Sequence, residues 1–316
     1  MKGNAKRRGG RGIGMAALLL ALVACGDKDA APVAAAVDPA FIAEQQQWRA
    51  QRYSELNAVD GWTSLVGLHW LEHKAHYIGS GPGSGIRLAV GPDKLGMVAR
   101  DGDVVFFTPE RGVPMTVEGE PVTGRIRFFS DRDGTPTRIA FDDGKGQLSL
   151  IHRGQRYALR VKHADAASRT GFTGLTYWDG GPAWKVAARF VPHAAGKTLP
   201  IVDITGLTTE MANPGALEFE KDGATYRMEA LGEPGGELFV IFGDRTSGHG
   251  SYPAGRYLDL PAPDASGQVV IDFNHAYNPP CAFTPFATCP LTPPENRLDL
   301  RVEAGERVYH TPEGAT

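Results

Sequence analysis

The stretch QLSLIHRGQRYALRVKH, residues 147–163, decides the fold class of this chain. On both sides of Arg153-Gly154, apolar residues such as Leu148 and Val161 alternate with polar ones, which is the two-residue period of β-strands. Glycine readily adopts the positive φ of a tight turn. The stretch therefore predicts an antiparallel β-hairpin that turns at Arg153-Gly154.

Similar strand signals recur through the chain of 316 residues, whose 40 Gly and 23 Pro favour many turns. The segments with strand patterns are DVVFFTP (103–109), PMTVEGEPV (114–122), GRIRFF (124–129), AWKVAARFVP (183–192), LPIVDIT (199–205), ALEFEKDGATYRMEAL (216–231), ELFVIFGD (237–244), RYLDL (256–260), GQVVIDFN (267–274) and RLDLRVEAG (297–305). Short strands at intervals of about 8–12 residues are typical of sandwiches and barrels. We therefore expect a mainly β fold with two packed, sandwich-like or barrel-like β modules at residues 60–163 and 170–310.

The first module faintly resembles forkhead-associated domains in the order of its landmarks. These landmarks are IGSGPGSGIRL (78–88), VEGEPVTG (117–124) and LSLIHRGQRY (148–157). Forkhead-associated domains hold phosphothreonine through an arginine beside the first glycine, where this chain has Ser80, and through a Ser-x-x-His element that this chain lacks. The resemblance implies a fold for this module and does not imply phosphopeptide binding.

A helix is expected ahead of the β modules. Asp38 is a suitable N-cap residue, and Pro39 fits the first turn of a helix. The stretch AFIAEQQQWRAQRYSEL (40–56) places apolar residues near one face, so residues 41–59 are predicted to contain an amphipathic helix. Residues 64–73 are expected to form a second short helix or helical turn.

His69 and His73 would share one face of that second helix, with Glu72 beside them. This order differs from the H-E-x-x-H pattern of zinc proteases, and no third ligand stands at a definite spacing. We therefore predict no metal site and no other cofactor for this chain.

The first 24 residues predict a secretory signal peptide. A basic start, up to Arg11, precedes an apolar run at 15–24 that is too short to span a bilayer, which takes a helix of about 20 residues. Residues 22–25, Leu-Val-Ala-Cys, resemble the bacterial lipobox, which implies cleavage before Cys25 and lipid attachment to it. Residues 25–40 are then a flexible tether. We expect a lipoprotein of the cell envelope, facing the periplasm in a Gram-negative cell; an ordinary signal peptide is the alternative.

The charge pattern argues against nucleic acid as a partner. The formal net charge is -3, and five of the 33 basic residues lie within the first 24 positions. The rest of the chain is more acidic still, and an acidic body has no long-range attraction for phosphate backbones. The sequence also lacks a basic stripe or an RNA-binding signature.

The segment FNHAYNPPCAFTPFATCPLTPPENRL, residues 273–298, combines many prolines with two of the three cysteines. Thiols outside the cytoplasm tend to oxidise, so we predict a disulfide between Cys281 and Cys289, which would stabilise the fold by about 2.5 kcal/mol. A metal site at the two cysteines and a catalytic Cys281 thiolate with His275 as its base are the alternatives. We expect this rigid loop to form the rim of a cleft.

Polar residues beside this loop predict a ligand-binding cleft. Asp272 and Asn274 share one face of a strand, and Asn278 is extended because it precedes a proline. In the polar segment 243–260, Arg256 is expected to bind an anion through its planar guanidinium. The candidate ligand-binding residues are Asp244, Tyr252, Arg256, Asp272, Asn274, Tyr277, Asn278, Asn296 and Arg297. In the alternative interpretation, these polar groups only satisfy the backbone of loops and turns.

The same C-terminal motif resembles a known family. The patterns FN-x-AYNPPCAF (273–283) and CPL-x-PPENRL (289–298) resemble the bacterial and archaeal family known as domain of unknown function 1684, with Thr292 where proline is commoner. Further landmarks in the same order are GWTSLVGLHWLE (61–72), RGQRYALRVK (153–162), WKVAARF (184–190), FGDRTSGHGSYPAGRYL (242–258) and VEAGER (302–307). The resemblance covers residues 45–307. It implies a shared architecture or site around residues 272–297 and no particular chemistry.

These patterns favour an envelope lipoprotein that binds a small polar or anionic ligand in a cleft beside residues 272–297. A hydrolase is the first alternative, with Asp272 or Glu306 as general base and Tyr252 or Tyr277 as acid or oxyanion donor. An envelope scaffold is the second alternative, and it predicts no pocket near Asp272. The expected partners are the membrane, through the lipid, and the small ligand.

Overall fold

The structure is a computed structural model that describes residues 37–310. From Val37 onward the chain forms one compact unit. The predicted signal peptide, the predicted lipidation site Cys25 and most of the predicted tether lie outside the described residues. Within the described range, no helix has the length and apolar character needed to cross a membrane.

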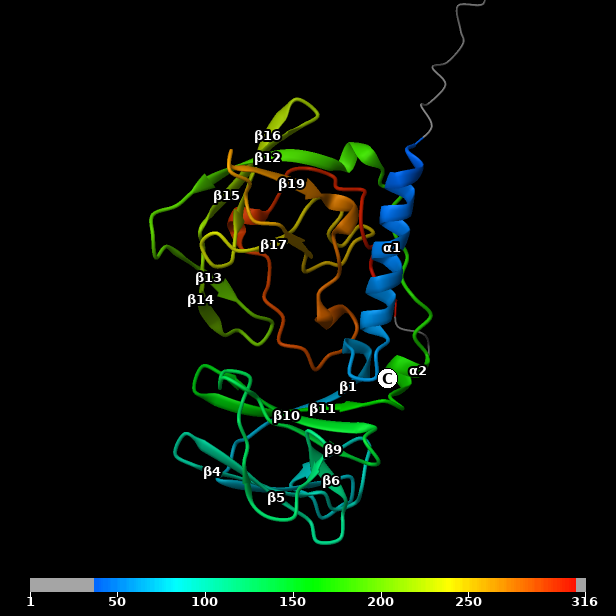
Figure 1. The fold of residues 1–316 in the computed structure, drawn as a ribbon, viewed down its shortest axis with the longest axis vertical. Helices are drawn as coiled ribbons and strands as arrows, with labels where there is room; N and C mark the ends of the chain where they lie inside the picture. The colour runs from blue at the N-terminus through cyan, green and yellow to red at the C-terminus, as the bar shows by residue number, and fades with distance from the viewer. Residues whose placement is uncertain (1–36, 311–316) are drawn as a thin grey trace, which may run out of the picture. The chain divides into compact units, whose positions relative to one another are not determined.

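The described chain begins with helix α1 (Pro39–Leu56), drawn in blue in Figure 1. Asp38 caps this helix as predicted, because its Oδ1 accepts a hydrogen bond from the Ala40 amide at 2.9 Å. The other helical segments are short: η1 (Trp62–Ser64), α2 (Ala167–Thr170), η2 (Pro182–Trp184), η3 (Phe273–His275), η4 (Pro280–Ala282) and η5 (Pro294–Asn296).

The first part of the compact unit contains two sheets, with the strand orders β1-β11-β10-β9-β6-β7 and β3-β2-β4-β5-β8. Their strands are β1 (Leu65–Trp70), β2 (Ala75–Gly79), β3 (Ile86–Arg87), β4 (Gly96–Asp101), β5 (Val104–Pro109), β6 (Met115–Val117), β7 (Glu120–Pro121), β8 (Ile126–Arg127), β9 (Arg138–Phe141), β10 (Gly146–Arg153) and β11 (Arg156–His163). Both sheets bury apolar side chains in one core, such as Phe107 of β5 and Leu159 of β11.

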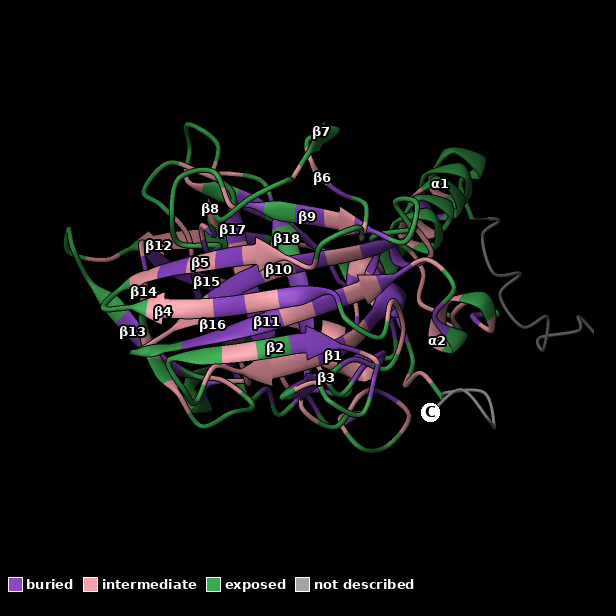
Figure 2. Cartoon of the chain, turned by 90° about the horizontal axis from the view of Figure 1, so that it is seen from below, coloured by how far each residue is buried: buried purple, intermediate pink, exposed green. Residues whose placement is uncertain are grey.

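β10 and β11 form the hairpin that the sequence predicts. Arg153 pairs with Arg156 across the turn, and Gly154 has a φ of 59°. Buried residues such as Leu148 and Leu150 alternate with more exposed ones, and Figure 2 shows this banding along the strands. The alternation gives the hairpin one face toward the core and one face toward the site described below.

The second part contains a four-stranded sheet with the order β16-β15-β12-β19 and two two-stranded sheets, β13-β14 and β17-β18. Their strands are β12 (Lys185–Pro192), β13 (Thr198–Val202), β14 (Thr208–Ala212), β15 (Gly215–Lys221), β16 (Ala224–Ala230), β17 (Leu238–Phe242), β18 (Arg256–Leu260) and β19 (Gln268–Asp272). Asp222 and Gly223 join β15 to β16 with positive φ, as a tight hairpin turn requires. The core of this part gathers around Phe242 and Phe273.

The prediction of a mainly β fold with an N-terminal helix is confirmed. The fold consists of several sheets, and none of those formed by residues 37–310 closes into a barrel. The boundaries expected for the two β modules stay a prediction.

The prediction of a second short helix at residues 64–73 is wrong. This segment contains β1, which pairs with β11, with His69 opposite Leu159. The hydrogen bonds of the sheet and the burial of Leu65 outweigh the local helical pattern. His69 and His73 therefore share no helix face. A metal site at these residues would have required that shared face.

The segment 297–305 has a strand pattern but forms no strand. Its alternate residues are buried, as in a strand, but its backbone bonds to scattered partners. The Leu298 amide donates to the Gly243 carbonyl, and the Arg245 amide donates to the Leu300 carbonyl. The Val302 amide donates to Asp244 Oδ2 at 2.8 Å, and the Arg256 guanidinium donates to the carbonyls of Val302 and Ala304. A buried charged pair thus supplies some of the hydrogen-bond partners that a neighbouring strand would supply.

Candidate functional site

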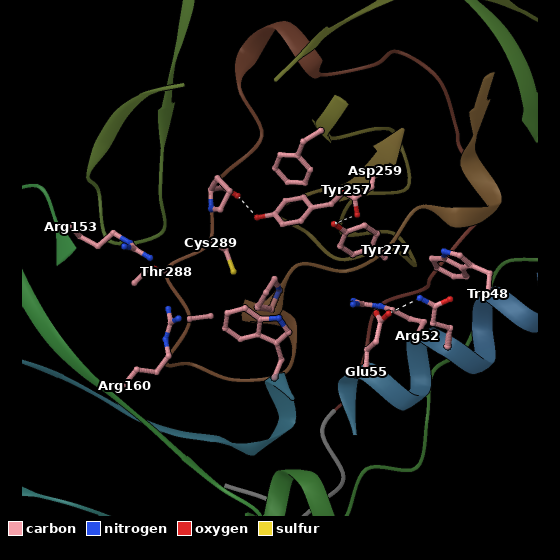
Figure 3. A pocket seen from close by; sticks show the side chains of 16 residues that line it. Trp48, Arg52, Glu55, Arg153, Arg160, Tyr257, Asp259, Tyr277, Thr288 and Cys289 are labelled. Carbon is pink, nitrogen blue, oxygen red and sulfur yellow. Dashed lines mark hydrogen bonds between the residues drawn. The ribbon is translucent and has the colours of Figure 1, made fainter. Parts of the chain in front are cut away.

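A cavity of about 610 Å³ lies between α1, the β10–β11 hairpin, strand β18 and the loop that follows η4. We call it the central cavity, and Figure 3 shows the side chains around it. Its lining combines arginines, carboxylates and aromatic rings, namely Arg52, Arg153, Arg160, Glu55, Asp259, Trp48, Trp62, Phe239, Tyr257 and Tyr277. Pockets that bind small molecules commonly have volumes of about 300–1,000 Å³. The central cavity therefore has the size and lining of a small-molecule site.

Helix α1 forms one wall of the central cavity. Trp48, Arg52 and Glu55 are spaced by three or four residues, so they share one face of the helix. Arg52 is held in place, since its Nε donates to Glu306 at 2.8 Å and its Nη2 donates to the Asn278 carbonyl at 2.9 Å. Because the Glu306 carboxylate is fully buried, the charge of Arg52 serves mainly to neutralise it.

The β10–β11 hairpin supplies the opposite side, where Arg153 and Arg160 lie near Thr288 in Figure 3. Arg153 is partly neutralised by Asp131, to which its Nη1 donates at 2.7 Å. Arg160 forms no salt bridge with any described residue, and its buried Nε has no hydrogen-bond partner among them. Burial, and then the charge of Arg153, lower the pKa of Arg160. An arginine stays protonated even so, and this side of the cavity is therefore positively charged.

Two tyrosines form an aromatic wall. The rings of Tyr257 and Tyr277 meet edge to face, with centroids 5.7 Å apart. The Tyr277 hydroxyl donates to Asp259 Oδ2 at 2.8 Å, and the Tyr257 hydroxyl donates to the Pro290 carbonyl at 2.7 Å. Burial raises the pKa of both hydroxyls, and the charge of Asp259 adds to the effect on Tyr277. Both tyrosines therefore act as neutral hydrogen-bond donors.

The loop that closes the cavity contains both described cysteines, and they are free thiols. The predicted disulfide is not formed in this structure. Cys289 Sγ instead accepts a hydrogen bond from the backbone amide of Cys281 at 3.0 Å. His275, the suggested base for a catalytic Cys281, stacks on Trp48 with ring centroids 4.8 Å apart. The loop thus borders a cavity, as expected, and does so with reduced cysteines.

Arg256, the residue predicted to bind an anion, lies in the core. Its guanidinium donates to the carbonyls of Val302, Ala304 and Glu306. Its Nη2 also pairs with Asp244 at 3.3 Å, and both side chains are 1% exposed. These contacts direct its donors to internal groups, so the prediction that Arg256 binds a ligand anion is corrected. Asp244 also lines a separate cavity, described below, and its ligand-binding role stays a prediction.

Asp272 and Asn274 also have structural roles. Asp272 Oδ1 accepts hydrogen bonds from the amide and the side chain of Asn274, at 2.9 and 2.7 Å. Asn274 Oδ1 in turn accepts from the Gly181 amide, and Gln45 of α1 donates to Asp272 Oδ2. The two residues join β19 to the chain before η2 and to α1, and they do not line the central cavity.

Glu44, Asp272 and His275 place one possible metal-ligand atom each within 4.8 Å of one another. Lys185 already brings a cation to this group, since its Nζ donates to Glu44 at 3.0 Å and lies 3.9 Å from Asp272. The Lys185 ammonium thus offsets one of the two carboxylate charges and already bonds to Glu44. This donor set therefore carries no metal assignment.

The remaining predicted residues are dispersed. The Asn278 amide donates to Glu306 at 2.7 Å, and the Asn296 side chain bonds to the backbone of Glu229 and Ile241. Two others, Asp244 and Arg297, line a separate cavity of about 440 Å³. Of the candidate ligand-binding residues, Tyr277 is the one that lines the central cavity. The alternative interpretation, in which polar groups satisfy loops and turns, holds for most of the rest.

The cavity residues that the sequence did not single out are Arg52, Arg153, Arg160 and Asp259. Arg160 occupies a polar position in an alternating strand, where solvent exposure is the ordinary expectation. Only the packing of α1 and the C-terminal loop over this strand turns its side chain into a cavity residue. The aromatic and basic residues of RGQRYALRVK (153–162) are the sequence signal that could have indicated this side of the cavity, but their alternation indicates only a hairpin.

Comparisons with known proteins place the chain in a family. Residues 170–307 match the family described as "Protein of unknown function (DUF1684)". The chain belongs to this family. The DUF1684 match ends at Arg307 and includes the loop at the rim of the cavity. It confirms the predicted resemblance over residues 170–307, and the resemblance expected for residues 45–169 stays a prediction. It does not include Arg52, Arg153 or Arg160, so the positive side of the cavity lies outside the matched residues.

Two solved structures are similar to parts of the DUF1684 chain. An uncharacterized protein of Haloarcula marismortui, determined by solution NMR, shares 35% identity over 44% of this chain and 78% of its own, with a TM-score of 0.37. The N-terminal FHA domain of EssC, a component of the bacterial Type VII secretion apparatus, shares 9% identity over 31% of this chain and 46% of its own, with a TM-score of 0.24. The search of curated proteins found no match.

Proposed function

We propose that this protein binds a small anionic molecule with a flat apolar part in the central cavity. The observation that carries the proposal is the guanidinium of Arg160, which lines the cavity and has no counter-ion among the described residues. A protein rarely leaves a partly buried charge without a partner, because burial of an unpaired charge is costly. A carboxylate or phosphate group in the cavity would supply the missing acceptor.

Neighbouring groups support an anionic ligand. Arg153 lies close enough to Arg160 for its charge to affect the pKa of Arg160. Arg153 Nη1 is bonded to Asp131, so the charge of Arg153 is partly neutralised, whereas the charge of Arg160 is not. Guanidinium groups bind carboxylate and phosphate through paired, charge-assisted hydrogen bonds. Attraction between two arginines and one anion would also relieve their mutual repulsion.

The rest of the lining supports a flat apolar part. Phe239, Tyr257 and Tyr277 form a series of edge-to-face contacts beside the cavity, and Trp48 and Trp62 line it as well. Aromatic rings favour stacked or edge-to-face contacts with other flat groups. An aromatic carboxylate or aryl phosphate therefore represents the proposed ligand class better than a free inorganic ion does.

Isothermal titration of the purified chain with benzoate and with neutral benzamide tests this proposal. We expect benzoate to bind more tightly than benzamide. Replacing Arg160→Gln is expected to weaken benzoate binding by about tenfold or more, the loss of a charge-assisted pair. Arg156→Gln is the matched control, because Arg156 lies on the same strand over Trp70 and outside the cavity lining. Equal benzoate affinity in wild type and in Arg160→Gln would reject the proposal.

A hydrolase is the alternative function, and the Tyr277–Asp259 hydrogen bond is the observation that favours it. The acid–base groups expected from the sequence do not support it. Glu306 is bonded to Arg52 and fully buried, and Asp272 lies outside the cavity. Asp259 is exposed, and a solvated carboxylate is more typical of a binding site. Hydrolysis of phenyl acetate or phenyl phosphate that is lost in Asp259→Asn would favour the enzyme.

We also propose that the chain is a lipoprotein of the cell envelope. Support comes from the sequence, where a basic start, a short apolar run and Leu-Val-Ala-Cys25 follow one another. Lipid chains on Cys25 would hold the protein at a membrane, since each buried methylene contributes about 0.8 kcal/mol. Fractionation of expressing cells tests this. Wild type is expected with the membranes, and Cys25→Ala is expected in the soluble fraction or retained as an unprocessed precursor.

A further inference from the structure

We propose that Cys281 and Cys289 form a thiol–disulfide exchange site at the edge of the central cavity, which reacts with small disulfides in the folded protein. Cys281 would attack the incoming disulfide, and Cys289 would resolve the product. This inference does not depend on the binding of an anion by Arg160. It concerns a second kind of chemistry carried by the same loop.

The geometry separates the two cysteines into an accessible and a sheltered thiol. Cys281 is half-buried, whereas Cys289 is 3% exposed. The Cys281 amide donates to Cys289 Sγ at 3.0 Å, which brings the sheltered sulfur next to the residue that carries the accessible one. The Tyr252 hydroxyl lies 3.5 Å from Cys281 Sγ. Cys281, the more exposed of the two residues, is therefore the one expected to meet a small disulfide first, and Cys289, which lines the central cavity, already lies beside it.

The surroundings of the thiols also favour Cys281 as the attacking thiol and Cys289 as the resolving one. Hydrogen bonds from the Cys289 thiol and from the Tyr252 hydroxyl stabilise the Cys281 thiolate and lower the pKa of Cys281 to about 7. The same interaction, together with burial, raises the pKa of Cys289. The thiolate is the reactive form in disulfide exchange, and an attacking thiol with a pKa near the ambient pH is close to optimal.

The exchange balances in two steps. The Cys281 thiolate attacks one sulfur of the small disulfide, forms a mixed disulfide and releases one small thiolate. The Cys289 thiol then loses its proton to solvent or to the released thiolate, and its sulfur attacks Cys281 Sγ. The internal disulfide forms and the second small thiolate leaves. Loss of the charge on Cys281 in the first step removes one cause of the raised pKa of Cys289, so the second step becomes easier.

The test uses the full chain with Cys25→Ala, so that only the two loop cysteines react. The folded protein is incubated with glutathione disulfide at neutral pH, quenched with acid and analysed by intact mass and peptide mapping. We expect a transient mixed disulfide followed by loss of two hydrogens, with the bond mapped between Cys281 and Cys289. In Cys289→Ser, the mixed disulfide on Cys281 should accumulate. In Cys281→Ser, the folded protein should react at least about tenfold more slowly, because its remaining thiol is sheltered and its burial still raises the pKa.

Two outcomes would overturn the proposal. One is equal reactivity of the two single variants, since it removes the division of roles. The other is an internal disulfide that forms only when denaturant is present. Circular dichroism of each variant confirms that it is folded, and if Cys281→Ser does not fold, partial alkylation of wild type with mapping of the first modified cysteine reports the same order of reaction. Anion titration of the same samples is a separate readout, so loss of anion binding would leave this result standing.

Discussion

The carboxylate of Asp244 lies 3.3 Å from the guanidinium of Arg256, and each side chain is 1% exposed. Both residues also bond to the backbone of the segment that ends the described chain, through the Val302 amide and the Val302 and Ala304 carbonyls. The pair therefore supplies side-chain partners to the Val302 amide and to two carbonyls of this segment.

Replacing Arg256→Met should destabilise the protein by about 3–5 kcal/mol, because it leaves Asp244 charged and buried without its partner and frees several carbonyls. Urea unfolding followed by tryptophan fluorescence measures the loss. Arg297→Met is the matched control, because Arg297 is exposed, and it should change the free energy of unfolding by less than about 0.5 kcal/mol. A loss below about 1 kcal/mol for Arg256→Met would contradict the structural role.

Removing a negative charge from the central cavity should strengthen anion binding. Asp259→Asn keeps an acceptor for the Tyr277 hydroxyl but removes one carboxylate from the lining. We expect benzoate to bind about three- to tenfold more tightly at low salt, and the gain should shrink as added salt screens the charges. Titration calorimetry at two salt concentrations measures it. Asp101→Asn, an exposed change outside the lining, should have no effect, and an unchanged or weaker affinity in Asp259→Asn would count against the electrostatic argument.

The reactivity of Cys281 should titrate near neutral pH. Its pKa is lowered to about 7, chiefly by the hydrogen bond from Cys289, and the thiolate is the form that reacts with iodoacetamide. The alkylation rate should therefore rise with pH through a midpoint near 7, while Cys289, whose pKa is raised, stays unmodified over that range. Peptide mapping after timed alkylation gives both rates. Cys289→Ala removes this donor, so a midpoint that fails to move upward in that variant would contradict the assigned cause.

The loop also depends on a contact with the first strand. Thr284 Oγ1 donates to the Leu65 carbonyl at 3.0 Å in a buried setting. Thr284→Val should cost about 1–2 kcal/mol, because it leaves that carbonyl without its partner while it preserves the shape of the side chain. Thr205→Val, at an exposed turn, serves as a comparison, although its hydroxyl bonds to Asp203. Differential scanning calorimetry of wild type and the two variants measures the effect. If both variants unfold at the same temperature, the Thr284 hydrogen bond makes no specific contribution to stability.

Local patterns predicted much of the fold. The β10–β11 hairpin follows from alternation on both sides of Gly154, and the cap of α1 follows from Asp38 and Pro39, because these signals need no distant partner. Where β1 forms, the local pattern predicts a helix, because the partner strand β11 lies far along the chain. The segment 297–305 has the pattern of a strand, yet some of its backbone partners are the side chains of residues 244 and 256, which no periodicity reveals.

The sequence predicts the location of the candidate site but not most of the residues that line it. The loop at 281–289 does border a cavity, and Tyr277 lines it. The sequence could not indicate that Arg256 turns inward while Arg160 lies in the cavity, because both are arginines in strands of alternating or apolar pattern. Which one reaches a cavity depends on elements that pack from elsewhere in the chain. Burial, rather than residue type, separates the two roles.

The contact between Leu65 and Thr284 joins positions 219 residues apart, and the Arg52–Glu306 pair joins positions 254 apart. Helix α1 and strand β1, which pairs with the hairpin, thus gain these contacts only from residues near the carboxyl end. A growing polypeptide on the ribosome would expose α1 and the hairpin long before their counterparts are synthesised. The chain cannot acquire its binding properties gradually during translation, and a product shortened by a premature stop before residue 284 would lack the site altogether.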